Sequence, residues 1–196
     1  KTQDMDVYND SQSLTAEIVA INGGDYEEVV FGTPVTVNIT DIGAIDDVTL
    51  ILDDVNVNEG TGTATVGGSL DYAPQTALIV TLSNGATITF GTDYVAGTIV
   101  QSTPFVIQGD DVYKDGETYT VTVVSTTGGN FENLVTTDTS TVTVTDTETP
   151  VTVNLSASTV NEDAANTSYV FTATLSAASQ GDTIIVTDKG TITIAD

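Results

Sequence analysis

The stretch Thr141–Leu155, TVTVTDTETPVTVNL, alternates threonine with valine on both sides of a short acidic segment that contains a proline. An alternation with period two places one set of side chains on each face of a half-buried β-strand. Threonine and valine suit a pleated sheet because they are β-branched, and the same alternation recurs at Thr120–Val123. No segment shows a convincing helical period, so the sequence predicts an all-β protein.

Short strands spaced about ten residues apart, with Gly, Asn and Asp between them, favour an immunoglobulin-like β-sandwich. Asn84-Gly85 is a strong hairpin signal because both residues tolerate positive φ. We expect strands at 48–57 with a break near Asp53-Asp54, and at 63–70, 78–82, 87–90, 98–100, 105–108, 118–125 and 140–145. The expected core consists of Leu50, Leu52, Val66, Leu70, Ile79, Leu82, Ile88, Val106, Tyr119, Val121, Val123, Phe131, Val142 and Val144.

The chain also repeats itself. Three segments recur 105 residues further on: Asp6–Tyr8 as Asp111–Tyr113, Gly23–Glu27 as Gly128–Glu132, and Asn38–Asp41 as Thr143–Asp146. Val48–Glu59 matches Val151–Glu162 at an offset of 103. A period of this size corresponds to one small domain. We therefore expect tandem repeats of about 105 residues, with a complete unit at 46–149, the back half of a unit at 1–45 and the front half of the next at 150–196, as in a piece of a longer array.

The amino-acid composition argues against some classes of function. Of 196 residues, 28 are Asp or Glu and three are Lys or Arg, and the net charge is −25. Without a cationic surface, binding to nucleic acid and insertion into anionic membranes are not expected. The absence of cysteine rules out disulfides, while a hydrophobic content of 39% still allows a packed core. Self-repulsion between the acids has to be offset, and divalent cations are the obvious means.

Several strings resemble the repeats of very large bacterial surface adhesins, the type I-secreted, biofilm-forming, repeats-in-toxin adhesins of the Lap type. These strings are Val80–Phe90, Asp110–Val123, Thr127–Leu134 and Val142–Asp163. The resemblance implies an immunoglobulin-like extender domain, strung in many copies, on the cell surface of a Gram-negative bacterium. In that family calcium makes the array rigid. The function implied is therefore that of an extracellular structural spacer, whose partners are the neighbouring repeats of the same chain.

The acids gather in loops that an immunoglobulin-like topology brings to the two ends of each unit. Oxygen ligands without His or Cys select calcium or magnesium over zinc, and calcium accepts irregular cages of loop oxygens. From the residues alone, calcium binding and simple solvation of acidic loops both remain open, and the resemblance favours Ca²⁺. The candidate metal ligands are Asp6, Asp10, Asp41, Asp46, Asp47, Glu59, Asp110, Asp111, Asp115, Asn130, Glu132, Asp146, Glu148, Glu162 and Asp182.

Other functions fit less well. No His or Cys is present to activate a nucleophile, and paired acids such as Asp53-Asp54 lack the aromatic cleft of a glycoside hydrolase, so we do not expect an enzyme. A calcium-dependent glycan- or ligand-binding module remains the alternative, although the chain has no Trp. An isopeptide crosslink would need a buried Lys on a strand, whereas Lys114 and Lys189 lie in predicted turns. Finally, the partial units could complement each other head to tail between chains.

Overall fold

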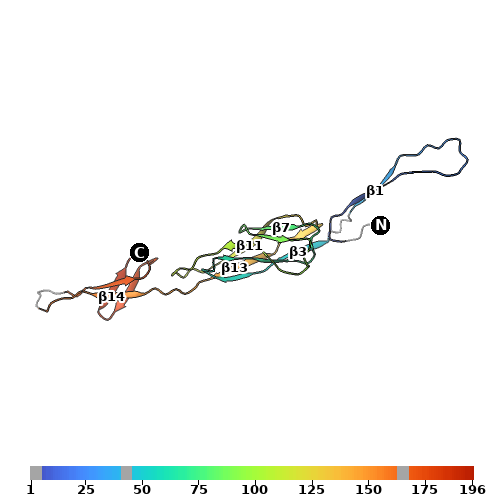
Figure 1. The fold of residues 1–196 in the computed structure, drawn as a ribbon. Coiled ribbons are helices and arrows are strands. Elements are labelled where there is room, and N and C mark those ends of the chain that lie inside the picture. Colours follow the sequence, from blue (N-terminus) through green and yellow to red (C-terminus); the bar gives the residue numbers. More distant parts are fainter. Residues whose placement is uncertain (1–5, 41–45, 163–167) are drawn as a thin grey trace. The chain divides into compact units, whose positions relative to one another are not determined.

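The computed structural model describes residues 6–40, 46–162 and 168–196, and all of their regular secondary structure is β (Figure 1). Two compact units are present. The first comprises Lys1–Val57, Thr63–Val106 and Thr118–Thr143, and the second Asn58–Gly62, Ile107–Glu117 and Val144–Asp196. Within the described residues, no helix is long and apolar enough to cross a membrane.

The centre of the chain folds into two main sheets and one short pair of strands. One sheet has the order β4 (Val55–Asn58), β13 (Thr139–Thr145), β11 (Glu117–Thr127), β7 (Leu78–Leu82) and β8 (Thr87–Phe90). The other has the order β12 (Asn133–Val135), β3 (Asp47–Leu52), β6 (Gly67–Leu70) and β9 (Val100–Gln101), and β5 (Thr63–Ala64) pairs with β10 (Phe105–Val106). This sheet order is that of an immunoglobulin-like sandwich. The predicted all-β sandwich is confirmed, and the tandem arrangement stays a prediction.

The first long strand changes sheets where the sequence predicts a break. Asp53 donates its N–H to Gly67 O at 2.9 Å, which keeps it in contact with β6. One residue later, Asp54 Oδ1 accepts the N–H of Thr141 at 2.7 Å, at the start of β13. The Ser140 hydroxyl fills the gap by donating to Asp53 O at 2.6 Å. The Asp53-Asp54 pair is therefore the hinge by which β3 and β4 join different sheets.

The alternation of Val, Leu and Thr sorts side chains between core and solvent. The buried core contains Val48, Leu50, Leu52, Val66, Leu70, Leu78, Val80, Leu82, Ile88, Phe90, Val121, Val142 and Val144. Burial of this apolar surface at roughly 25 cal/mol per Å² is the main force that holds the two sheets together.

Two core predictions were wrong by one residue. Ile79 and Val106 are exposed, Val106 to 82%, because their neighbours Leu78, Val80 and Phe105 point inward instead. A shift of one residue exchanges the two faces of a strand, and continuous apolar runs such as Leu78–Val80 do not reveal the phase. Three further predicted core residues are half-buried: Tyr119, Val123 and Phe131. The prediction also missed β12, which pairs in parallel with β3.

The flanking segments form separate hairpins. β1 (Gln12–Ala16) pairs antiparallel with β2 (Val35–Ile39). In the tail, β14 (Val153–Ala157) pairs with β15 (Phe171–Leu175), and β16 (Thr183–Thr187) with β17 (Gly190–Ile194). The pair Val153↔Leu175 lies at offsets of 103 and 105 from the pair Leu50↔Leu70 between β3 and β6. The repeat in the sequence therefore extends to the register of strand pairing.

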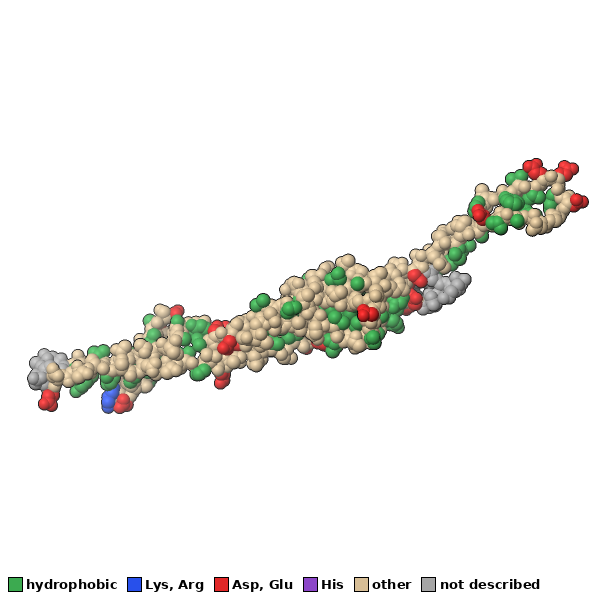
Figure 2. Space-filling model, viewed as in Figure 1, with side chains coloured by type: hydrophobic (Ala, Val, Ile, Leu, Met, Phe, Trp, Pro, Cys, Tyr) green, Lys and Arg blue, Asp and Glu red, His purple; other side chains and the backbone are tan. Residues whose placement is uncertain are grey.

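The loop between β1 and β2 carries acidic and apolar side chains exposed together (Figure 2). Gly23, Gly24 and Asp25 all have positive φ in this loop. Gly128, Gly129 and Asn130 have the same conformation in the central unit. At Gly128 a Cβ would collide with Ala77 O, so glycine is required there by close backbone approach as well as by φ.

Candidate metal centre

Three carboxylates meet beside the ends of β4 and β13. Glu59 follows β4, Asp146 follows β13, and Asp115 lies in the loop before β11. One carboxylate oxygen from each residue lies within 4.8 Å of the others. We call these three residues the carboxylate cluster. All belong to the second compact unit.

Glu59 is the most buried member, with only 4% of its surface exposed. Its Oε1 accepts the N–H of Thr147 at 3.0 Å, which fixes the direction of the side chain. Its Oε2 is shielded from solvent and has no hydrogen-bond partner, and the same holds for Asp146 Oδ1. A buried carboxylate oxygen without a partner is costly. A cation held between these oxygens would remove that cost, so the residues fit a metal ion.

Backbone contacts hold the three segments together. Glu59 donates its N–H to Thr145 O at 3.0 Å, and Gly60 donates to Gln108 O at 3.0 Å. Gly116 allows the loop before β11 to approach β13, because a Cβ there would lie 2.9 Å from Val144 O. This close approach places Asp115 against Asp146. The three acids are among the ligands that the sequence predicts, whereas no sequence pattern signals the positioning roles of Gly116 and of the Thr147 backbone.

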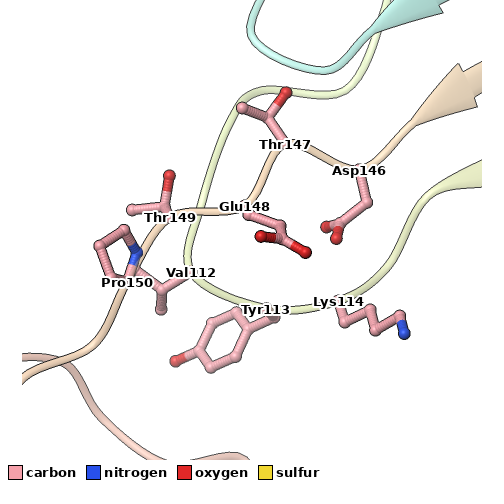
Figure 3. Close-up of a pocket in the computed structure, with 8 residues that line it drawn as sticks. All are labelled: Val112, Tyr113, Lys114, Asp146, Thr147, Glu148, Thr149 and Pro150. Atoms are coloured by element: carbon pink, nitrogen blue, oxygen red, sulfur yellow. The ribbon is translucent and has the colours of Figure 1, made fainter.

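Lysine does not neutralise the cluster within the described part of the chain. The ion pair found there joins Lys189 Nζ to Asp188 Oδ2 at 3.0 Å, and both side chains are exposed. Lys114, although close in sequence to Asp115, points away from the carboxylates of Asp146 and Glu148 (Figure 3). Neutralising the negative charge of the cluster therefore requires a cation from solution.

A hollow of about 490 Å³ lies in the same unit, lined by Val112, Tyr113, Lys114, Asp146, Thr147, Glu148, Thr149 and Pro150 (Figure 3). Glu148 is exposed at its wall, outside the carboxylate cluster. Asp110 Oδ2 lies 3.5 Å from the Thr149 hydroxyl, and Asp111 Oδ1 accepts the N–H of Tyr113 at 2.7 Å. These three predicted ligands thus share the loops of the cluster without joining it.

A second set of predicted ligands lies around the loop after β11: Asp46, Asp47, Asn130 and Glu132, which we call the loop group. Glu132 Oε2 accepts the N–H of Asp46 at 3.1 Å. Asp47 Oδ1 accepts from Asn133 Nδ2 at 2.7 Å. Asn130 Nδ2 donates to Asn9 O at 3.2 Å and to Gln75 Oε1 at 2.7 Å. The polar groups here bind protein donors and acceptors.

The remaining predicted ligands are scattered. Asp6 Oδ1 accepts the N–H of Tyr8 at 2.8 Å, and Asp10 is half-buried nearby in sequence. Glu162 and Asp182 are exposed. Asp41 lies outside the described residues. Among the residues that the structure describes, the carboxylate cluster is the one group of three or more metal-ligating side chains brought together.

Two comparisons with known proteins bear on the identity of the chain. A search of curated proteins gives no match to the chain. The family model of the LapA domain matches residues 46–147, which span the central sandwich and Asp146. LapA domains are adhesin-related and not known as enzymes, which fits a role at the cell surface. Because the match covers more than half of the chain, this protein belongs to the LapA domain family.

Proposed function

We propose that the chain is a structural spacer of a bacterial surface adhesin, made rigid by calcium bound at the ends of its β-sandwich repeats. In this proposal each repeat is a unit of about 105 residues whose partners are the neighbouring repeats. The adhesin is secreted by a type I system and remains on the outside of a Gram-negative cell, where it would contribute to biofilm formation. The observation that carries the calcium proposal is the unpartnered, buried Oε2 of Glu59 within the carboxylate cluster.

Calcium suits the donors better than other metals do. The three carboxylates offer hard oxygen ligands, and the chain has no His or Cys for zinc. Calcium takes six to eight oxygens in flexible geometry, whereas magnesium demands a near-ideal octahedron. Loops and strand ends supply irregular geometry, so Glu59, Asp115 and Asp146 would be joined by carbonyls or water to complete the shell.

The mechanical consequence follows from where the ligands lie along the chain. Asp146 begins the segment that leads from β13 to β14, and Thr147 is already tied to Glu59. An ion shared by Glu59, Asp115 and Asp146 would therefore fasten this segment to the end of β4 and to the loop before β11. Without the ion, three close negative charges repel one another and loosen the same segment. Calcium would thus stiffen the linker between repeats.

Calcium titration and thermal unfolding test the proposal. Isothermal titration should detect calcium binding, and unfolding followed by circular dichroism should show a melting temperature about 10–20 °C lower in EDTA than in calcium at a hundredfold excess over Kd. That excess adds about 2.7 kcal/mol, and about 1 kcal/mol shifts the melting temperature by roughly 4–8 °C in a domain of this size. Small-angle scattering should show a narrower range of conformations in calcium. Identical melts and scattering profiles in calcium and EDTA would refute the proposal.

A further inference from the structure

The head of the chain docks on two loops of the central sandwich. The Tyr8 hydroxyl donates to Ala73 O at 2.7 Å, in the loop between β6 and β7. The Tyr8 ring stacks on Phe131, in the loop between β11 and β12, with centroids 5.8 Å apart and planes inclined by 20°. Val7 beside it is only 7% exposed. A directed hydrogen bond, an aromatic stack and a buried apolar side chain therefore act together at this contact, which lies within the first compact unit.

Backbone bonds complete the contact. Glu132 donates its N–H to Val7 O at 2.9 Å, and Asn9 donates its N–H to Asn130 O at 3.1 Å. Asn130 Nδ2 donates in turn to Asn9 O at 3.2 Å. All of these donors and acceptors are uncharged, and salt screens only interactions between charges. The contact therefore needs neither a metal ion nor low ionic strength.

The docked segment belongs to a different repeat from the sandwich that receives it. Asp6–Tyr8 has its counterpart 105 residues further on in Asp111–Tyr113, which lies in the loop before β11. The hairpin that follows agrees, because β1 and β2 correspond at the same offset to residues of β11 and β13, which are neighbours in one sheet. In the repeat frame, Val7–Asn9 is therefore part of the loop before the β11-type strand of the preceding repeat.

The same hydrogen bond occurs a second time, one repeat further along the chain. The Tyr113 hydroxyl donates to Ala178 O at 3.1 Å, and this pair is separated by 65 residues, as Tyr8 and Ala73 are. Ala178 precedes β16 as Ala73 precedes β7. In both copies the tyrosine N–H donates to the Asp Oδ1 two residues earlier, at 2.8 and 2.7 Å. A bond that recurs with the same partner at the same spacing is a property of the repeat.

We propose that this tyrosine is a junction lock between successive repeats that does not depend on metal. In each repeat it docks on the loop between the β6-type and β7-type strands of the following repeat, and the loop after that repeat's β11-type strand packs on its ring. The lock rests on the repeat frame of the proposed spacer but not on its calcium ion. It limits how far the junction loosens when calcium is removed, so calcium stiffens repeats that already touch.

Amide hydrogen exchange on the full chain tests the lock at Tyr8. Tyr8→Ala removes the ring that stacks on Phe131 and the hydroxyl that binds Ala73 O. The Glu132 amide, which donates to Val7 O, should then lose protection by about tenfold or more, because a stack and a hydrogen bond are lost together and exchange reports the local opening.

Two controls separate this local loss from unfolding. The Leu82 amide donates to Ala86 O within the sandwich, so its protection should not change in Tyr8→Ala. Tyr26→Ala is the matched variant, because Tyr26 is 71% exposed and takes no part in the contact, and it should leave the protection of Glu132 as in wild type.

Carbon-detected NMR tests both copies of the lock. Tyr8→Phe and Tyr113→Phe keep the ring and remove only the hydroxyl. The carbonyl carbon of Ala73 should shift in the first variant alone, and that of Ala178 in the second alone. Carbonyl–nitrogen spectra record both signals, including that of Ala73, which amide-detected spectra miss because Pro74 has no N–H.

The same measurements in EDTA distinguish the lock from the calcium site. Protection of the Glu132 amide should be the same in EDTA as in calcium, and protection that vanishes in EDTA would overturn the lock. Unchanged protection in Tyr8→Ala, or an Ala178 carbonyl that does not respond to Tyr113→Phe, would overturn it as well. A chain that binds no calcium but keeps this protection would refute the proposed spacer mechanism and leave the lock in place.

Discussion

The carboxylate cluster and the loop group are equally acidic in sequence but differ in how their oxygens are satisfied. In the loop group, Glu132 and Asp47 accept hydrogen bonds from a backbone N–H and a side-chain amide. In the cluster, Glu59 Oε2 and Asp146 Oδ1 are buried without a partner. Acid density therefore does not distinguish a metal centre from a hydrogen-bonded loop, whereas unsatisfied buried oxygens do. The two sets should respond differently to calcium.

The largest effect is expected for Glu59→Gln. Glutamine keeps an oxygen that can accept the Thr147 N–H, but it loses the charge that would bind the ion. In saturating calcium the variant should forfeit most of the calcium-dependent rise in melting temperature, about 10–20 °C. Thermal unfolding followed by circular dichroism, with and without calcium, measures this loss.

The sign should reverse in EDTA. Glu59→Gln removes one of three crowded negative charges, so the metal-free variant should be at least as stable as wild type. A merely structural Glu59 would instead make the variant equally destabilised in both buffers. Asp93→Asn, a matched change at an exposed acid outside the cluster, should behave as wild type in calcium and in EDTA.

A smaller effect is expected for Asp115→Asn. Asp115 is the exposed member of the cluster, so its removal should weaken calcium affinity with little change in metal-free stability. We expect a loss of affinity of about tenfold or more, because even outer-shell partners of metal ligands contribute roughly 10–100-fold. Isothermal titration measures the change, and an unaltered Kd would exclude Asp115 from the coordination shell.

Much of the fold could be predicted from the sequence, because the alternation of Thr with Val or Leu indicates which face of a strand is buried. The prediction failed at Ile79 and Val106, because a run of consecutive apolar residues does not show which side chains of the strand point inward. It also missed β12, whose pairing with β3 depends on residues 86 positions away, such as Asp47 for Asn133. Short parallel strands of this kind have too little local pattern to be recognised.

The candidate site could be predicted only in part. Topology correctly brought the loops of Glu59, Asp115 and Asp146 to one place, because the ends of β4 and β13 and the start of β11 are neighbours in one sheet. Asp110, Asp111 and Glu148 share these loops but do not belong to the group of three. The close approach at Gly116 brings Asp115 toward Asp146, and the Thr147 N–H holds Glu59, and neither feature has a sequence signature.

The loop group supplies the contrasting prediction. Glu132→Ala removes the acceptor of the Asp46 N–H and should cost about 1 kcal/mol, the usual net contribution of one hydrogen bond. The loss should be the same in calcium and in EDTA, because the interaction is satisfied within the protein. Urea unfolding in both buffers measures the free energy of unfolding. A loss seen only in calcium would mean that the loop group binds metal too, and the distinction between the two sets would fail.

The smallest effect is expected for Asp47→Asn. Asp47 is exposed, and an asparagine oxygen can still accept from Asn133 Nδ2, so the bond that ties β3 to β12 survives the change. Exposed substitutions of this kind usually change stability by less than about 0.5 kcal/mol. Urea unfolding should therefore place the variant within error of wild type, and calcium titration should give the wild-type Kd and stoichiometry. Loss of a calcium equivalent would show that the carboxylate charge of Asp47, and not its role as an acceptor, is what this position needs.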